Sequence, residues 1–410
     1  IENTRAADNL VAVAEGALQE VSSLLLELGE LVARTANEAA LGDEEVRANQ
    51  LQIDAILESI DRIANATAFK GRKLLNGTFD YVVSGQTSDI TSIQVNGARM
   101  PNGGTKNVVV EITASAKTGQ LVYSGDSVNG AVTIRVAGNK GIESFSFSSG
   151  TAAASIATAI NQSTELTGVS AYVSGTGAST RVLFNSTAYG SDQFVTVEAL
   201  SGSFSVTGDD GTTTDFGADV GALINGVTAN TGLNAAVRTT GLGLELILDS
   251  TFAQTVGGST SFDITGGGAN LSLAPEVTLA GQESIGFQAV DSSGLGNALA
   301  GFLSSLKSGG ANDLDSQNFA TAQEILDAAS KQVASLRGRL GAFQKNTLQT
   351  NINSLQVAFE NTAAAESAIR ETDFAEETSN LTRAQILVNA AGATLQIANS
   401  LPQNVLALLG

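Results

Sequence analysis

The chain has 410 residues, which is long enough for several domains with their own cores. Its 41 acidic residues outnumber 21 basic ones and give a formal net charge of −20. Because the basic residues are also scattered, this composition argues against binding to nucleic acid or to an anionic membrane. The chain contains no Cys and no His, which removes His-based catalytic triads, disulfides and zinc sites that need nitrogen or sulfur ligands. We expect neither enzyme activity nor a cofactor.

The sequence gives no sign of a membrane segment or a leader. No run of eighteen consecutive apolar residues occurs, and Ile1–Arg5 lacks the charged and apolar arrangement of a signal peptide. Because the chain opens on Ile, we expect it to be a fragment or a processed form.

The first 67 residues have the periodicity of two helices. Across 6–38, apolar residues recur at alternating spacings of four and three, as in the seam of a coiled coil. After a polar turn, Asp43 is expected to cap a second, antiparallel helix that ends near Thr67. The expected buried positions are Leu10, Ala14, Ala17, Val21, Leu24, Leu28 and Leu31, followed by Val46, Ile53, Ile56, Ile60 and Ile63.

From Phe69 the apolar period changes to two, which indicates strands separated by glycine turns. Phe79–Val83 and Ile90–Val95 are predicted to form a β-hairpin. Residues 107–200 are predicted to form an α+β module whose helix runs from Thr151 to Gln162, and about 204–289 to form an all-β module. The strands expected in the first module are Val108–Ile112, Val132–Val136, Phe145–Phe147, Val169–Val173, Arg181–Asn185 and Phe194–Ala199.

The helical period returns near Leu314. One heptad phase comprises Leu326, Val333, Leu336, Leu340 and Phe343. A second comprises Leu348, Ile352, Leu355 and Phe359, and it follows a one-residue slip that should locally perturb the helix. A last helix with small and apolar residues at heptad spacing is expected to end at Pro402 and to lack a partner within the chain.

Several stretches at the two ends resemble bacterial flagellin closely, in the order found in that family. They cover roughly 10–100 and 285–410, and Asp219–Val227 is similar to a shorter motif of flagellin and hook proteins. The stretches are Ala14–Val21, Ile60–Ala64, Thr67–Gly71, Leu74–Gly77, Glu366–Arg370, Asp373–Ala375, Leu381–Leu387 and Pro402–Leu409.

The resemblance implies a multi-domain fold: an antiparallel α-helical coiled-coil rod built from both chain ends, with a β-hairpin and inserted β-rich and α+β variable outer domains. The implied domains are rod helices and hairpin (1–100), an α+β outer domain (101–207), an all-β outer domain (208–289), a return strand and rod helix (290–365) and a filament-core helix (366–410). The implied function is that of the structural subunit of the flagellar filament, a self-assembling homopolymer for swimming motility. The expected assembly residues are Leu381, Ala384, Val388, Ala391, Leu395, Ala398, Val405 and Leu408.

The resemblance further implies export through the flagellar type III apparatus, an extracellular location, and contacts with cap proteins, hook-junction proteins and a secretion chaperone. Flagellins carry a further segment before the stretch that corresponds to Ala14, and almost all of it is missing here. Without that segment, we expect 376–410 to expose apolar surface and the chain not to form native filaments alone.

A second departure concerns the vertebrate Toll-like flagellin receptor. Recognised flagellins carry a basic residue about four positions before a Leu on the rod and an acid on the second helix. This chain has Glu27 before Leu31, and Gln52 on the second helix. A reversed charge at a receptor contact predicts weak activation of that innate immune receptor.

Two other functions fit the pattern. A hook–filament junction protein shares the helical ends, and a surface adhesin or polysaccharide-binding protein could act through outer modules with exposed aromatics such as Tyr172 and Tyr189. A cluster of acids (Asp209, Asp210, Asp215 and Asp219) could hold Ca²⁺, but its spacing does not match an EF-hand and a solvated turn is the favoured interpretation.

Overall fold

The computed structural model describes residues 1–37, 42–100, 104–208, 211–229, 232–239, 241–274, 278 and 281–410. The chain divides into two units, one formed by Ile1–Asp8 with Ala342–Gly410 and the other by Asn9–Gly341. Within the described residues, none of the helices combines the length and the apolar character needed to cross a bilayer.

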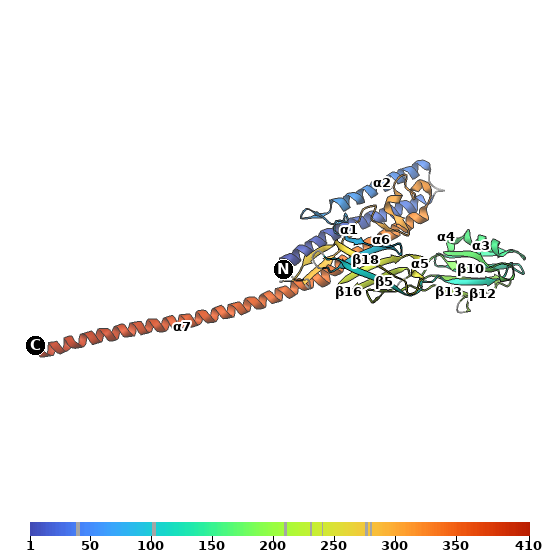
Figure 1. The fold of residues 1–410 in the computed structure, drawn as a ribbon. Coiled ribbons are helices and arrows are strands. Elements are labelled where there is room, and N and C mark those ends of the chain that lie inside the picture. Colours follow the sequence, from blue (N-terminus) through green and yellow to red (C-terminus); the bar gives the residue numbers. More distant parts are fainter. Residues whose placement is uncertain are drawn as a thin grey trace. The chain divides into compact units, whose positions relative to one another are not determined.

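Three long helices lie close together in the unit Asn9–Gly341 (Figure 1). They are α1 (Glu2–Thr35), α2 (Asp43–Ala66) and α6 (Phe319–Phe343). The Arg337 guanidinium on α6 donates to Glu15 on α1 at 2.8 Å, and the Asn49 amide on α2 donates to Thr35 at 3.0 Å. α1 is therefore packed against both of the other helices.

The buried stripe of α1 differs from the predicted seam. Leu10, Ala17 and Leu24 are only half-buried, and Val11, Leu18 and Leu25 take the central positions. Because α1 packs against two helices, its apolar face is wider than the seam of a two-stranded coiled coil. The other buried apolar residues from Asn9 onward are Ala14, Val21, Leu28, Leu31 and Val32.

The N-terminus of α2 also differs from the prediction. Gly42, not Asp43, is the N-cap residue, and its amide donates to the Glu45 carboxylate at 3.1 Å. Glu45 thus supplies the side-chain half of a capping box, so no cap from Asp43 is needed. The predicted positions Ile53, Ile56 and Ile60 are buried, whereas Val46 and Ile63 are half-buried.

The predicted seam of α6 is confirmed at four of its five positions. Leu326, Val333, Leu336 and Leu340 are buried, and Phe343 is half-buried. Ile325 and Ala329 widen this face, again because the helix has more than one neighbour.

The strands of this unit form two hydrophobic cores. The first core belongs to what we call the split module, because its strands come from two separate parts of the sequence. A five-stranded sheet in the order β15-β14-β5-β18-β3 packs against a three-stranded sheet in the order β16-β17-β4. Its elements are β3 (Tyr81–Ser84), β4 (Ile90–Ala98), β5 (Lys106–Ala114), β14 (Gly221–Ile224), β15 (Val227–Ala229), β16 (Asn234–Thr239), β17 (Leu242–Leu248), α5 (Ser250–Ala253) and β18 (Ser259–Gly267).

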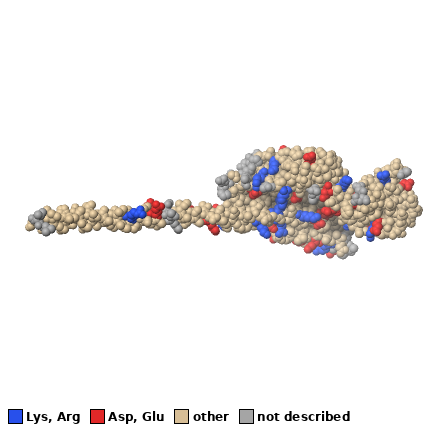
Figure 2. Space-filling model, turned by 90° about the horizontal axis from the view of Figure 1, so that it is seen from below, with Lys and Arg blue, Asp and Glu red and all other residues tan. Residues whose placement is uncertain are grey.

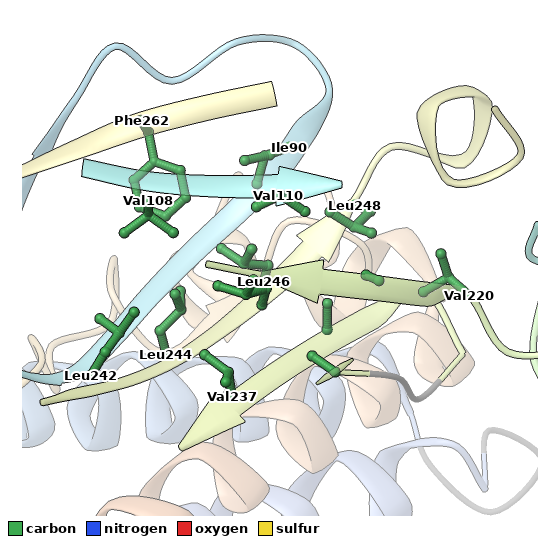
Figure 3. Packing of buried hydrophobic residues seen from close by; sticks show 14 of the residues in the cluster. Ile90, Val108, Val110, Val220, Val237, Leu242, Leu244, Leu246, Leu248 and Phe262 are labelled. Atoms are coloured by element: carbon green, nitrogen blue, oxygen red, sulfur yellow. The ribbon is translucent and has the colours of Figure 1, made fainter. Parts of the chain in front are cut away.

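Figure 3 shows how side chains from the two sheets fill the split module. Val108 and Phe262 come from one sheet, Leu244 and Leu246 come from the other, and all four are buried in the same cluster (Figure 3). The alternation in β17, where every second residue is buried, is the strand period read from the sequence.

The predicted hairpin of Phe79–Val83 with Ile90–Val95 is wrong in its pairing. β3 pairs with β18, and β4 pairs with β17 in the other sheet. The strands themselves are present, but the segment between them crosses from one sheet to the other. Alternation identifies which face of a strand is buried; it does not identify the strand beside it.

The second core belongs to the inserted module, residues 120–216, which lies in the sequence between β5 and β14. Two four-stranded sheets, in the orders β12-β6-β10-β9 and β13-β11-β7-β8, enclose a core with Phe184 and Ile134. Its elements are β6 (Gln120–Ser124), β7 (Val132–Gly138), β8 (Ile142–Phe147), α3 (Ala153–Asn161), α4 (Thr164–Thr167), β9 (Val169–Ser174), η2 (Gly177–Ser179), β10 (Arg181–Ser186), β11 (Phe194–Ser201), β12 (Val206–Thr207) and β13 (Thr214–Phe216).

The module limits differ from those expected. Val108–Ile112 was assigned to the α+β module, but its strand β5 lies between β14 and β18 of the split module. Conversely, β13 lies beyond the expected limit at 207 and pairs with β11 of the inserted module. The two pairings of β5 join residues more than a hundred positions apart, and local periodicity carries no information about which strands lie side by side.

The segment between the two modules and α6 consists of short elements. Along it, residues 292–314 are bound to one face of α2 through Gln50, Asp54 and Asp61. Together with the β1/β2 pair after α2, the short elements are β1 (Ala68–Phe69), β2 (Arg72–Lys73), β19 (Ala269–Ser272), β20 (Gln282–Ile285), β21 (Gly296–Asn297), β22 (Gly301–Phe302), η4 (Leu303–Leu306) and η5 (Leu314–Ser316).

In the other unit, the long helix α7 (Thr350–Leu409) follows a π-helical segment, η6 (Gln344–Gln349). The Gln344 amide donates to Asp8 at 2.9 Å and the Thr4 hydroxyl bonds Asn351 at 3.3 Å, so these segments run antiparallel. The π-helical segment lies at the predicted slip between Phe343 and Leu348, because a π turn accommodates one extra residue. Leu348 and Ile352 beyond it are buried, Leu355 is half-buried and Phe359 is exposed.

The prediction that the last helix ends at Pro402 is wrong. α7 continues through Pro402 to Leu409, and no separate helix begins near 366. Proline removes one backbone donor and strains the preceding turn, but it does not by itself end a helix whose other hydrogen bonds are retained.

Candidate assembly surface

The predicted assembly residues lie on α7, and those whose side chains are described are exposed. Leu381 exposes 58% of its surface, Val388 71% and Leu395 65%. These three residues are seven positions apart, and Ala384, Ala391 and Ala398 each follow one of them by three positions. Spacings of three and four place all six on one face of a helix, which we call the α7 stripe. Val405 is also exposed, and the side chain of Leu408 lies outside the described residues.

The chemistry of this surface is almost entirely apolar. No charged residue follows Arg383 in the sequence, and Figure 2 shows the corresponding end of the helix without Lys, Arg, Asp or Glu. Leu and Ala at heptad spacing form a surface for another helix, with the small residues allowing close approach. Such a surface has no group for acid–base catalysis, so binding is the chemistry that it supports.

Sequence periodicity alone missed part of this surface. Exposed Ile386, Leu387, Ile397, Leu401 and Leu406 lie on α7 outside the stripe. A helix that is apolar around most of its circumference is typical of a buried position among several neighbours. The absence of charge after Arg383 is the signal in the sequence that could have indicated them.

Of the four acids considered for Ca²⁺, the structure describes Asp215 and Asp219. Asp209 and Asp210 lie outside the described residues. Asp215 accepts the Gln120 amide at 2.8 Å, and Asp219 accepts the Ser191 and Gly232 amides at 2.7 and 2.8 Å. The Ser191 amide is the main cause of a lowered pKa for Asp219. Across the described ranges, no group of three acidic side chains is placed to hold a metal ion.

Three family models match the chain. The bacterial flagellin N-terminal helical region matches residues 1–80, the bacterial flagellin C-terminal helical region matches 323–409, and the flagellin hook IN motif matches 132–188. A putative flagellin of Bacillus subtilis is 40% identical over 138 residues, which are 86% of that protein and 32% of this chain. The chain belongs to the flagellin family. The hook IN match lies in the inserted module, away from Asp219–Val227, where the sequence suggested a related motif.

Other flagellins match in part or at lower identity. Flagellin C of Vibrio cholerae serotype O1 is 46% identical over 123 residues, and the match covers 28% of this chain and 32% of that flagellin. Flagellin D of Vibrio anguillarum is 25% identical over the whole chain and 83% of its own length. The high identity is therefore confined to about a third of the length of such relatives.

The residues expected to face the flagellin receptor are only partly brought together. The Gln52 amide on α2 donates to the Glu27 carboxylate on α1 at 3.5 Å, and both side chains are exposed. Leu31 is only 4% exposed, so its assignment as a receptor-facing residue is wrong. Leu31 lies on the apolar face of α1, which packs against neighbouring helices.

The two tyrosines suggested for glycan binding differ in their exposure to solvent. Tyr172 is exposed on β9, but Tyr189 is half-buried against the split module and its hydroxyl accepts a hydrogen bond from the Gln254 amide at 3.1 Å. Tyr189 therefore has a structural contact, and the two tyrosines do not offer the pair of exposed rings that the sequence suggested.

Proposed function

We propose that this chain is the structural subunit of a bacterial flagellar filament and that it polymerises through the α7 stripe. The observation that carries the proposal is the uncharged, exposed apolar helix beyond Arg383, in a family whose helical models match both chain ends. Exposed apolar residues at 381, 388 and 395 gain free energy when neighbouring subunits cover them, at roughly 25 cal/mol per Å². Assembly is thus the state in which this helix becomes buried.

The antiparallel coiled-coil rod is part of the same proposal. Within one unit, Gln344–Asp8 and Asn351–Thr4 support it, because a step forward along the C-terminal segment is matched by a step back along the N-terminal one. Within the other unit, Arg337–Glu15 joins α6 to α1. A rod of this kind presents both chain ends to assembly and leaves the two β modules free to vary.

A pair of adjacent substitutions tests the assembly proposal. Val388→Asp places a charge in the α7 stripe, whereas Asn389→Asp places the same charge on the next residue outside it; both positions are exposed in the subunit. We expect fragments of native filament to bind the parent chain and N389D but not V388D, as measured by co-sedimentation. Equal binding of V388D and the parent chain would contradict the proposal.

We extend the proposal to the partners of such a subunit. The lack of Cys suits export as an unfolded chain through the flagellar type III apparatus, since no premature disulfide can form. The apolar α7 helix suits a secretion chaperone that binds a helix in a groove. In the assembled flagellum, the subunit would follow the hook-junction proteins along the filament. New subunits would be added at the growing end, beneath the cap proteins.

The hook–filament junction remains the alternative for the same fold, because the helical ends are shared. A filament subunit is present in many copies, and a junction protein in few. Quantitative mass spectrometry of sheared filaments therefore separates the two: the chain should be the dominant protein, and a trace amount would favour the junction.

We also propose that the vertebrate flagellin receptor is activated weakly. The support for this proposal is that Glu27 precedes Leu31 by four positions, the spacing at which the resemblance to flagellins implies a basic residue, and that the Glu27 carboxylate is exposed beside Gln52. Reporter cells exposed to Glu27→Arg should respond more strongly than cells exposed to the parent chain. An equally strong response to the parent as to a recognised enteric flagellin would reject this part.

A further inference from the structure

The split and inserted modules are joined by two chain segments, residues 115–119 and 217–220. Both segments are anchored at the split module, where Ala116 and Val220 are buried in its core. Leu121, just beyond the first segment, is buried in the core of the inserted module. Modules joined in this way would ordinarily be expected to move relative to each other unless their contact is extensive.

The two joining segments are bonded to each other and to a loop of the inserted module. The Lys117 and Ala218 backbones exchange two hydrogen bonds, of 2.9 and 3.0 Å. The Gly190 amide also donates to the Lys117 carbonyl at 3.2 Å, and the Gly217 amide donates to the Gln193 carbonyl at 2.8 Å. Loop 187–193 therefore lies against the joining segments.

Close backbone packing leaves no room for a side chain at Gly190 or Gly217. A Cβ on Gly217 would lie 2.4 Å from the Gly190 carbonyl oxygen, and a Cβ on Gly190 would lie 2.8 Å from the Cα of Gly232 in the split module. Gly190 also has a φ of +118°, which residues with a Cβ rarely adopt. The loop of one module thus touches the backbone of the other.

One side chain binds both sides of this contact. The Asp219 carboxylate accepts the amide and hydroxyl of Ser191, in the inserted module, at 2.7 and 3.0 Å. It also accepts the amide of Gly232, in the split module, at 2.8 Å. Hydrogen bonds to a carboxylate are stronger than those between neutral groups, and three of them converge here.

We propose that Asp219 locks the joint between the two modules, so that the inserted module is held at a fixed angle and becomes a hinged domain when this carboxylate is lost. The hinge would be the segments 115–119 and 217–220. This assignment does not depend on the filament proposal, because it concerns the subunit alone.

The absence of native Cys allows a direct measurement of the joint. Ser144→Cys on β8 and Ser261→Cys on β18 place one spin label on an exposed position of each module. Pulsed electron spin resonance on the full chain gives the distribution of distances between them. We expect a narrow distribution for the parent and a broadened one for Asp219→Ala.

The matched control is Asp192→Ala, which removes an exposed carboxylate from the same loop without touching the joint. It should leave the distribution narrow. Amide hydrogen exchange at Ile134 and Val110 reports whether both cores are intact. If D219A disturbs either core, Asp219→Asn serves instead, because it keeps the shape and removes the charge. A distribution as narrow in the folded Asp219 variant as in D192A would overturn the proposal.

Discussion

The Asp61 carboxylate accepts both the backbone amide of Ser292, at 2.6 Å, and the hydroxyl of the same residue, at 3.0 Å. The Lys307 ammonium lies 2.9 Å from it. Seven residues earlier on α2, Asp54 makes the same kind of pair with the amide and hydroxyl of Ser308. Two carboxylates thus bind residues 292–308 to one face of α2.

Acid should weaken this attachment. Burial opposes ionisation of Asp54 and Asp61, but hydrogen bonds from the two serines outweigh it, and both pKa values are lowered. The unfolded chain then binds more protons, so the stabilisation is present above about pH 4 and is lost as the pH falls through the folded values. Urea unfolding of the parent and of the Asp54→Asn/Asp61→Asn double variant should differ most at pH 6 to 7, and the difference should shrink as the pH falls below the ordinary pKa of an Asp carboxyl and through the lower folded values. A difference independent of pH would show that charge is not the cause.

Arg339 should contribute more to stability than other cations of α6. Its guanidinium donates to Asn96 and to the Gly286 carbonyl, and burial lowers its pKa to about 10, with the nearby Glu245 and Asp80 acting in the opposite direction. Arg339→Met leaves these acceptors without a donor, and we expect the free energy of unfolding to fall by about 3 kcal/mol.

Lysine at the same position is expected to recover only part of this loss, because an ammonium cannot reproduce the fork of donors. The exposed Lys331→Met on the same helix is the control and should change the free energy of unfolding by less than about 0.5 kcal/mol. Equal losses for R339M and K331M, measured by denaturant unfolding, would show that burial of Arg339 is unimportant.

Leu336→Ala tests the helical core directly. Leu336 is 2% exposed and sits at a confirmed seam position of α6. Truncation removes buried methyl groups and leaves a cavity, so the free energy of unfolding should fall by about 2–5 kcal/mol. Ser335→Ala, on the exposed neighbour, should be nearly neutral. Thermal unfolding followed by circular dichroism measures both, and a neutral L336A would rule out a packed seam at this point.

The π-helical segment gives a prediction about chain length. Phe343 and Leu348 are five positions apart, so deletion of the exposed Lys345 restores an ordinary spacing of four. We expect this deletion to be tolerated, with unchanged helical circular dichroism and thermal midpoint, because a regular α turn replaces the π turn.

Deletion of the exposed Ala334 is the matched control. It rotates the preceding seam residues by about 100° against those that follow, because an α-helix has 3.6 residues per turn. It should therefore be strongly destabilising. Equal effects of the two deletions would mean that the π turn does not accommodate the additional residue.

The sequence predicted features that depend on near neighbours in the chain. The helix that contains Leu336, the position of the slip after Phe343 and the buried alternation around Leu246 all follow from periods of 3.6 and 2, and the structure contains them. The exposed positions of Val388 and Leu395 on α7 were likewise expected.

Features that depend on distant residues could not be predicted in this way. β4 pairs with β17, about 150 residues later, and β5 is separated from its partner β14 by the entire inserted module. Leu31 is buried. The sequence alone could not show that it does not face a receptor, because its burial depends on the second helix that packs against α1. The joint at Asp219 has no sequence signature, because its three donors come from Ser191 and Gly232.

Lys117 and Ala218 are paired backbone to backbone where the inserted module begins and ends. The chain therefore leaves the split module and returns to it at almost the same point. Such a geometry makes residues 118–217 an exchangeable cassette: a short turn could replace them, or a foreign domain with adjacent termini could be grafted in their place, without altering the sheets that receive it. Variation among related chains can then be concentrated in one removable part while the helices at the two chain ends remain unchanged.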